Sequence, residues 1–121
     1  MSEIRFRRLF ETSKDGLLIL NAKTGMIEAV NPFMIELLGF SKVQFLEKAI
    51  WEISPFKDII ANKERFSELL QHKYVRYQNQ PLETAGGKKV NVEFISNVYL
   101  TDDKEIIQCQ IRIRSNPNEV K

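Results

Sequence analysis

The sequence predicts an α+β fold in which a five-stranded antiparallel sheet carries short helices packed on one face. Two observations support this prediction. Segments with strand character lie before residue 31 and after residue 73, and the stretch between them is divided by helix-capping residues. The segment 105–114 alternates apolar and polar side chains, so one face of the sheet must be covered. The helices are the cover that the chain provides.

The first 14 residues are predicted to form a helix and a linker that precede the domain. Ser2 can cap a helix that carries Phe6, Leu9 and Phe10 on one stripe. Such an apolar stripe has to be buried, either on the domain's own sheet or on a second copy of the chain. We therefore expect a homodimer that forms through Phe6, Leu9 and Phe10 and through the outer face of the sheet.

Two strands and a short capped helix are expected next. Residues 17–21 and 26–30 form a hairpin that leads into the stretch AVNPFMIELLGF. Asn31 can accept a backbone N–H at the helix N-cap, and the proline that follows suits the first helical position. Gly39 can adopt the left-handed conformation that ends a helix. We therefore expect Asn31 to be a structural cap.

Three further helices are predicted before the chain returns to strands. Ser41 followed three residues later by Gln44 is a capping-box pattern, so Ser41 is a second expected structural cap. The Ser-Pro pair at residues 54–55 can begin a short helical turn. Asn62 is expected to cap a longer helix whose apolar face includes Phe66.

The second half of the chain is predicted to be a three-stranded meander, with strands at residues 74–84, 88–100 and 105–114. Ser96 is the only polar interruption of the apolar face of the middle strand. The apolar series of the last strand is Ile107, Cys109, Ile111 and Ile113. Residues 15–114 are assigned to the domain. Residues 115–121 are polar and are assigned to a C-terminal tail.

Composition argues against several classes of function. A net charge of +2 gives no strong attraction to nucleic acid or to a membrane surface. No apolar run approaches the roughly 20 residues of a membrane helix, and no signal peptide is visible. These features predict a cytoplasmic location without direct membrane insertion. One histidine, His72, and one cysteine, Cys109, provide neither a Cys–His pair nor a multi-His metal site, and we expect no catalysis by this domain.

The order of these elements resembles that of a PAS domain. The stretch DGLLILNAKTGMIEAVNPFMIELLGFSKVQFLEK resembles the opening half of the family, and YVRYQNQPLETAGGKKVNVEFISNVYL and EIIQCQIRIR resemble its remaining strands. The similarity extends over about residues 5–114. It implies a sensory or interaction module, usually one segment of a histidine kinase, a cyclic-dinucleotide enzyme or a transcription regulator. An output domain in the same or a longer chain is the implied partner.

The resemblance also implies a pocket between the helices and the inner sheet face. Its expected lining is Ile50, Trp51, Phe66, Phe94 and Ile111. Two interpretations remain open: a sensor that binds a small molecule in an apolar cavity, and a ligand-free module whose filled core serves dimerisation and protein–protein interaction. Trp51 can be a core residue in either, or it can stack on an aromatic ligand. A small cone-shaped hydrolase or isomerase would need an acid–base group in the pocket, and the inner faces offer almost none.

The cofactor is unknown, but two kinds are disfavoured. Photoactive flavin relatives carry a Gly-x-Asn-Cys stretch whose cysteine forms the flavin adduct. The matching residues here are 47–50, with Ile50 in the last position. Haem-binding relatives place a histidine in the long helix near Asn62 or Lys63, and neither residue can ligate iron. Covalent flavin and haem are therefore disfavoured, whereas non-covalent FAD remains open.

Overall fold

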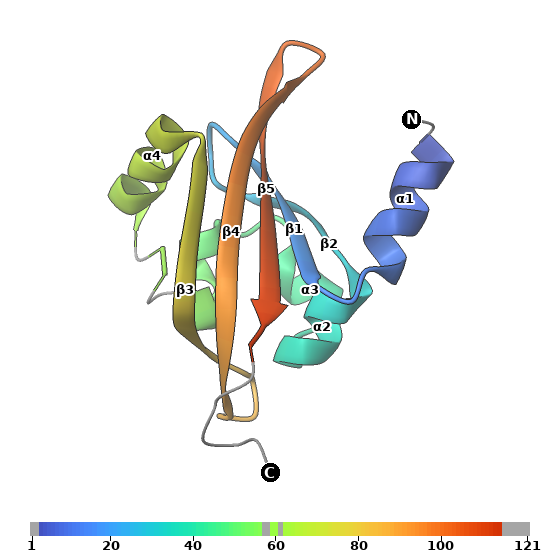
Figure 1. The fold of residues 1–121 in the computed structure, drawn as a ribbon, viewed down its shortest axis with the longest axis vertical. Coiled ribbons are helices and arrows are strands. Elements are labelled where there is room, and N and C mark those ends of the chain that lie inside the picture. The colour runs from blue at the N-terminus through green and yellow to red at the C-terminus, as the bar shows by residue number, and fades with distance from the viewer. Residues whose placement is uncertain (1–2, 57–58, 61, 115–121) are drawn as a thin grey trace.

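A five-stranded antiparallel sheet forms the centre of the protein, with the strand order β2-β1-β5-β4-β3 (Figure 1). This computed structural model describes residues 3–56, 59–60 and 62–114. The strands are β1 (Gly16–Asn21), β2 (Ile27–Val30), β3 (Tyr74–Glu83), β4 (Lys89–Thr101) and β5 (Lys104–Ile113). The last strand lies between the first and the fourth, so the two halves of the chain meet in the middle of the sheet. The predicted sheet is confirmed.

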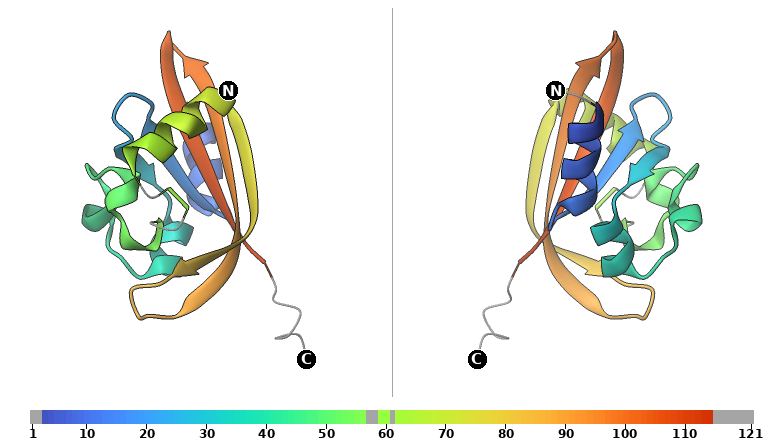
Figure 2. Two further views of the ribbon diagram at one scale, coloured as in Figure 1. Left: turned by 90° about the vertical axis from the view of Figure 1, so that its left-hand side faces the viewer. Right: turned by 90° about the vertical axis from the view of Figure 1, so that its right-hand side faces the viewer.

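The helices form a second layer on one face of the sheet, except for the first (Figure 2). Their bounds are α1 (Glu3–Thr12), α2 (Pro32–Leu38), α3 (Lys42–Phe45) and α4 (Lys63–His72), with 3-10 turns η1 (Ile50–Glu52) and η2 (Ser54–Phe56). Helix α1 stands beside the β1–β2 side of the sheet, apart from the helical layer (Figures 1 and 2). The sheet and the helical layer therefore enclose one interior between them.

The hydrophobic core lies between the sheet and the helical layer. Each layer contributes side chains that are at most 2% exposed, among them Leu18, Phe94, Ile107 and Ile111 from the strands and Met34, Phe45, Phe56 and Phe66 from the helical side. Burying an apolar side chain of this size contributes about 1.5–3 kcal/mol to stability. The inward series predicted for the last strand is buried as far as Ile111, whereas Ile113 at its end is 45% exposed.

The short helix α2 begins and ends as the local sequence requires. The Asn31 side chain accepts a hydrogen bond from the Met34 N–H at 3.1 Å. Gly39 has φ 81°, and its N–H donates to the Ile35 carbonyl at 2.9 Å. At Ser41, the Gln44 side chain accepts a hydrogen bond from the Ser41 N–H at 2.7 Å, which is the reciprocal half of a capping box.

One element has no counterpart in the sequence prediction. The 3-10 turn η1 is held by backbone pairing with the β1–β2 turn, because the Ile50 N–H donates to the Gly25 carbonyl at 2.9 Å. The Ile27 N–H also donates to the Lys48 carbonyl at 2.8 Å. This pairing fixes Ile50 and Trp51 over the end of the hairpin. The expected cap at Ser2 and the expected tail at residues 115–121 lie outside the described residues.

Candidate functional site

The five residues predicted to line a pocket lie in one hydrophobic cluster. Ile50, Phe66, Phe94 and Ile111 are at most 2% exposed, and Trp51 is half-buried against them. Two direct pairings hold the set together. Phe94 on β4 lies opposite Ile111 on β5, and the ring centroids of Trp51 and Phe66 are 5.6 Å apart. The arrangement is a packed interior with one aromatic residue, Trp51, at its border.

The Trp51 ring packs against the backbone of Gly25, which has no side chain. A Cβ atom at Gly25 would be only 2.5 Å from the Trp51 ring, and Gly25 has φ +75°, a conformation that glycine adopts without steric cost. The indole is therefore fixed between the β1–β2 turn and Phe66 on α4. Because Trp51 is only partly buried, it closes this end of the cluster and also reaches solvent.

Among the described residues, the inner sheet face contains one fully buried polar side chain, Ser96. Ser96 is 0% exposed, and among the described residues its hydroxyl has only the Cys109 thiol as a hydrogen-bonding neighbour, with no full hydrogen bond to Oγ. It lies two residues beyond Phe94 and opposite Cys109 on β5. Burial raises the pKa of the Cys109 thiol to about 12, so the thiol stays neutral. A thiol is a weak hydrogen-bonding group, so the Ser96 hydroxyl lacks a strong partner, and an unmet buried hydroxyl costs about 1–3 kcal/mol.

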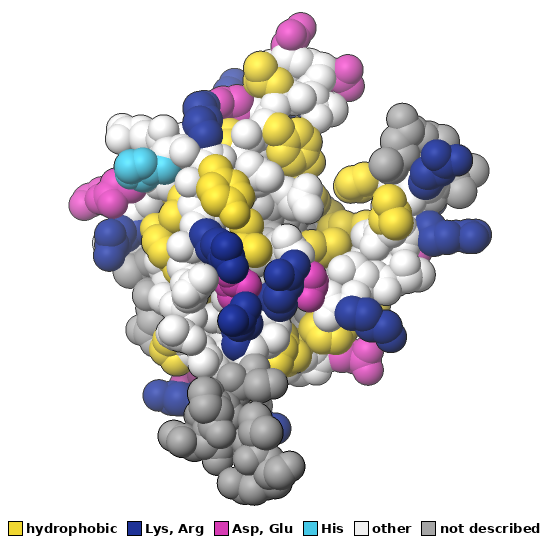
Figure 3. All heavy atoms as spheres, in the orientation of Figure 1, with side chains coloured by type: hydrophobic (Ala, Val, Ile, Leu, Met, Phe, Trp, Pro, Cys, Tyr) yellow, Lys and Arg dark blue, Asp and Glu magenta, His cyan; other side chains and the backbone are white. Residues whose placement is uncertain are grey.

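The outer sheet face carries a buried carboxylate that the sequence analysis did not single out. The Glu93 side chain on β4 is 0% exposed and lies opposite Arg112 on β5. The Arg76 guanidinium donates to Glu93 Oε2, and Arg114 Nη1 donates to Glu93 Oε1 at 3.2 Å. Figure 3 shows Lys and Arg side chains gathered around acidic ones in the middle of this face. The hydrogen bond from Arg76 holds the pKa of Glu93 below its ordinary value, against the opposing effect of burial.

A hollow of about 570 Å³ lies at the edge of the sheet rather than against the five predicted residues. It is formed between β2 and α3, and Met26, Val43 and Leu46 are among its walls. Within the described part of the chain, no three His, Cys, Asp or Glu side chains are grouped so that they could hold a metal ion. The helices of that part are all too short or too polar to cross a lipid bilayer.

Comparison with known families identifies the family to which this chain belongs. A model of the PAS domain matches residues 4–73, which is more than half of the chain. The chain belongs to the PAS domain family. A comparison with curated protein sequences finds no match.

Solved structures with this PAS fold come from several organisms. The PAS domain of an HTR-like protein from Haloarcula marismortui is 23% identical and has a TM-score of 0.75, with 92% of this chain and 90% of that chain covered. A domain of a sensory box sensor histidine kinase/response regulator from Geobacter sulfurreducens is also 23% identical, with a TM-score of 0.70 and coverage of 88% and 90%. The PAS domain of nitrogen regulation protein NR(II) from Vibrio parahaemolyticus is 13% identical, with a TM-score of 0.67 and coverage of 94% and 100%. At these identities the likeness shows a shared fold.

The PAS domain also contains features that sequence reasoning missed. Glu93 was overlooked because strand alternation alone assigns it to a solvent-exposed face. The signal that could have found it is the pair of arginines at 112 and 114, which share one face of β5 and meet Glu93 once the β4–β5 hairpin is in register. The sequence identifies Ser96 as a polar interruption, but only the packed structure shows that its neighbour on the facing strand is the weakly bonding Cys109 thiol.

Proposed function

We propose that this PAS domain is a sensory signalling module that binds a small, largely apolar molecule between the helical layer and the inner sheet face. It then relays binding to an attached output domain such as a histidine kinase. The observation that carries the proposal is Ser96. Its hydroxyl is fully buried, has only the weakly bonding Cys109 thiol as a hydrogen-bonding neighbour among the described residues, and lies on the same face as Phe94 and Ile111. A single hydrogen-bonding group on an apolar ligand would satisfy it.

The residue at the entrance of the proposed site is Trp51. It is the half-buried member of the five residues, and its ring rests on Gly25 and Phe66 rather than on the sheet. A ligand that enters the cluster has to displace or stack on this ring. Ile111 lies on β5, close to the point where the chain leaves the domain, so a shift of the inner face reaches the exit at Arg114.

A ligand-free module is the second candidate. The observation that favours it is the complete burial of Ile50, Phe94 and Ile111, which leaves the predicted pocket filled by the domain's own side chains. In that case the module serves dimerisation and protein–protein interaction, and Ser96 is a tolerated polar core residue.

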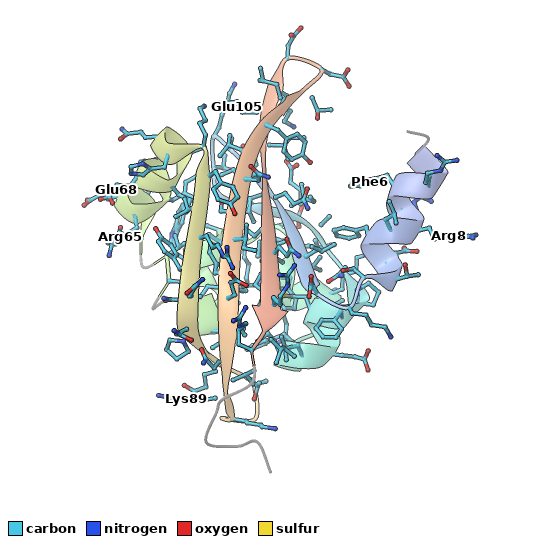
Figure 4. The ribbon with its side chains drawn as sticks, in the orientation of Figure 1. Phe6, Arg8, Arg65, Glu68, Lys89 and Glu105 are labelled. Atoms are coloured by element: carbon cyan, nitrogen blue, oxygen red, sulfur yellow. The ribbon has the colours of Figure 1, made fainter. Side chains whose placement is uncertain are left out.

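The homodimer remains part of the proposal, with a narrower set of contacts. Phe6 projects from α1 on the side that faces the sheet, whereas Arg8 points away (Figure 4). Phe6 is 46% and Leu9 56% exposed, so both apolar side chains are available to a partner. Phe10 is half-buried, stacks on Phe6 at 6.1 Å and anchors the helix through its carbonyl. We infer that Phe6 and Leu9 contact the second copy and that Phe10 positions the helix.

Thermal-shift measurements with a collection of small apolar molecules, each with one hydrogen-bonding group, test the ligand proposal. We expect a subset to stabilise the unmodified protein and to lose that effect in Ser96→Ala. The control is Ser67→Ala, because the Ser67 hydroxyl lies on α4 and bonds only to the Lys63 carbonyl at 3.1 Å. Native mass spectrometry and an absorption spectrum of the purified protein check for a molecule that is already bound. If every compound acts equally on both serine variants, or none stabilises the protein, the ligand-free module is the better account.

A further inference from the structure

The cluster around Glu93 holds more positive charge than the buried carboxylate requires. Arg76 and Arg114 bond Glu93 directly, and Arg112 Nη1 lies 3.9 Å from Glu93 Oε1. Asp15 is the second acid, with its Oδ2 3.6 Å from Arg112 Nε and accepting from Gln110 Nε2 at 2.6 Å. Three guanidinium groups thus face two carboxylates, so one positive charge remains.

The three arginines keep hydrogen-bond donors that point away from Glu93. Their side chains are 46–47% exposed, and each guanidinium has five N–H donors. Glu93 uses only part of this set and remains ionised, because Arg76 holds its pKa low. The carboxylate therefore fixes the guanidinium planes in place before any partner arrives. Such pre-ordered arginine forks are suited to binding carboxylates in pairs of hydrogen bonds.

A basic hollow adjoins this cluster at Arg114. It has a volume of about 250 Å³ and lies between α2, the start of β4 and the end of β5. Lys88, Lys89 and Arg114 provide its charged walls, while Leu37, Val90 and Ile113 provide the apolar ones. Ile113 is 45% exposed here although its neighbours on the same strand face are buried. None of the described residues that line the hollow is acidic.

We propose that Arg76, Arg112 and Arg114, together with Lys88 and Lys89, form a docking surface for an acidic protein segment that also carries an apolar side chain. Below, this set is called the arginine surface. The carboxylates of the segment bind the exposed guanidinium and ammonium donors, and its apolar side chain enters the hollow beside Leu37 and Ile113. The arginines lie on the outer face of the sheet, away from Ser96 and the interior to which the ligand proposal refers, so either proposal can fail without the other.

Charge and shape favour this occupant over the alternatives. A small free anion would meet the arginines but would leave the apolar walls of the hollow exposed, and ion pairs on an open surface are weak. A second copy of α1 is a poor match, because three of its ten residues are arginines at positions 5, 7 and 8. An acidic segment with an apolar residue satisfies both halves of the surface.

Peptide binding tests the proposal. The probe is a fluorescent peptide of glutamate and leucine, and the control is the same peptide with lysine in place of glutamate. Fluorescence anisotropy measures the binding of both peptides at two salt concentrations. We expect the acidic peptide to bind more tightly and its affinity to fall with salt. The double variant Arg112→Gln with Arg114→Gln should weaken it by roughly tenfold or more, about 1.4 kcal/mol. Arg76 still pairs with Glu93 in this variant.

A second variant protects the test against a folding defect. Lys88→Gln with Lys89→Gln changes only the start of β4 and the turn before it, and we expect it to weaken peptide binding several-fold while the melting temperature is unchanged. The control is Lys23→Gln with Lys63→Gln, which removes the same charge elsewhere.

Equal affinity for the two peptides, or equal weakening by the control, would overturn the proposal. Displacement of the peptide by inorganic phosphate at matched ionic strength would show a small-anion site instead. A change in self-association without a change in peptide binding would show an interface between copies.

Discussion

The side-chain amide of Asn31 donates a hydrogen bond to the Phe10 carbonyl at 3.0 Å and thereby connects the N-terminal helix to the domain. The same amide donates to the Asp15 carbonyl at 3.0 Å. The side-chain oxygen accepts from the N–H groups of Leu17 at 2.9 Å and Met34 at 3.1 Å. One fully buried residue thus joins α1, the linker, β1 and α2. A displacement of α1 is therefore transmitted to the first strand and to the helical layer.

Asn31→Ala should be among the most damaging single substitutions in this domain. It removes the α2 cap and leaves buried backbone groups of three segments without their partner, so we expect a loss of about 2–4 kcal/mol in the free energy of unfolding. Urea denaturation measures it. Asn62→Ala is the matched control, since the Asn62 side chain caps α4 through the Arg65 N–H at 3.0 Å, a bond within the helix's own first turn. It should cost about 1 kcal/mol. Equal losses would show that the long-range bonds of Asn31 contribute nothing.

Gly25→Ala should displace Trp51. The new Cβ would lie 2.5 Å from the indole and would force a side chain into a backbone with φ +75°, so we expect a destabilisation of about 1–3 kcal/mol. Trp51 is the only tryptophan, so its fluorescence reports the displacement directly. Gly86→Ala serves as the control, because the nearest atom to its Cβ would be 3.9 Å away. An unchanged emission spectrum in Gly25→Ala would contradict the observed packing of Trp51.

Glu93 should make the stability of the domain depend on pH in acid. Its pKa is lowered in the folded state from the ordinary 4.5, so the stabilisation is present above that value and is lost as pH falls through the folded pKa. We expect Glu93→Gln to be less stable than the unmodified protein at neutral pH, with the difference shrinking as the solution is acidified. Urea denaturation at neutral and acidic pH tests this.

The control for Glu93 is Glu68→Gln. Glu68 pairs with Arg65 at 3.4 Å on the exposed surface of α4 (Figure 4), with side chains about 60% exposed. Such an exposed pair contributes little to stability, so this variant should follow the unmodified protein over the same pH range. A difference between Glu93→Gln and the unmodified protein that stays constant into strong acid would contradict the ion cluster.

Local features of the fold could be predicted from the sequence, because their causes lie within a few residues. The cap of α2 at Asn31 and the end of α2 at Gly39 depend on adjacent backbone groups. The alternation of buried and exposed side chains in β5 depends only on strand geometry. The bonds from Asn31 to Phe10 and Leu17 span 21 and 14 residues. No local pattern encodes them.

The candidate site could be predicted only in part for the same reason. Strand alternation selected Phe94 and Ile111, which the structure pairs across β4 and β5. The 3-10 turn at Ile50 was missed because its backbone partner, Gly25, lies in a distant turn. Three arginines meet Glu93 only when β3, β4 and β5 are paired in their observed register, which includes the irregularity in β3 between Tyr77 and Gln80. Only the assembled sheet shows it.

The exposed stripe of α1 should control self-association without supporting the monomer. Phe6 and Leu9 are 46% and 56% exposed, so replacing both by serine should leave the free energy of unfolding of the monomer nearly unchanged. If the two side chains become buried against a second copy, their loss should weaken the dimer by roughly 1.5–3 kcal/mol each. Analytical ultracentrifugation over a range of protein concentrations measures this effect. Phe10→Ser is the contrasting variant, because the Phe10 side chain is half-buried, so it should lower stability as well. A protein that stays monomeric at high concentration, or a dimer that the double substitution leaves intact, would contradict dimerisation through α1.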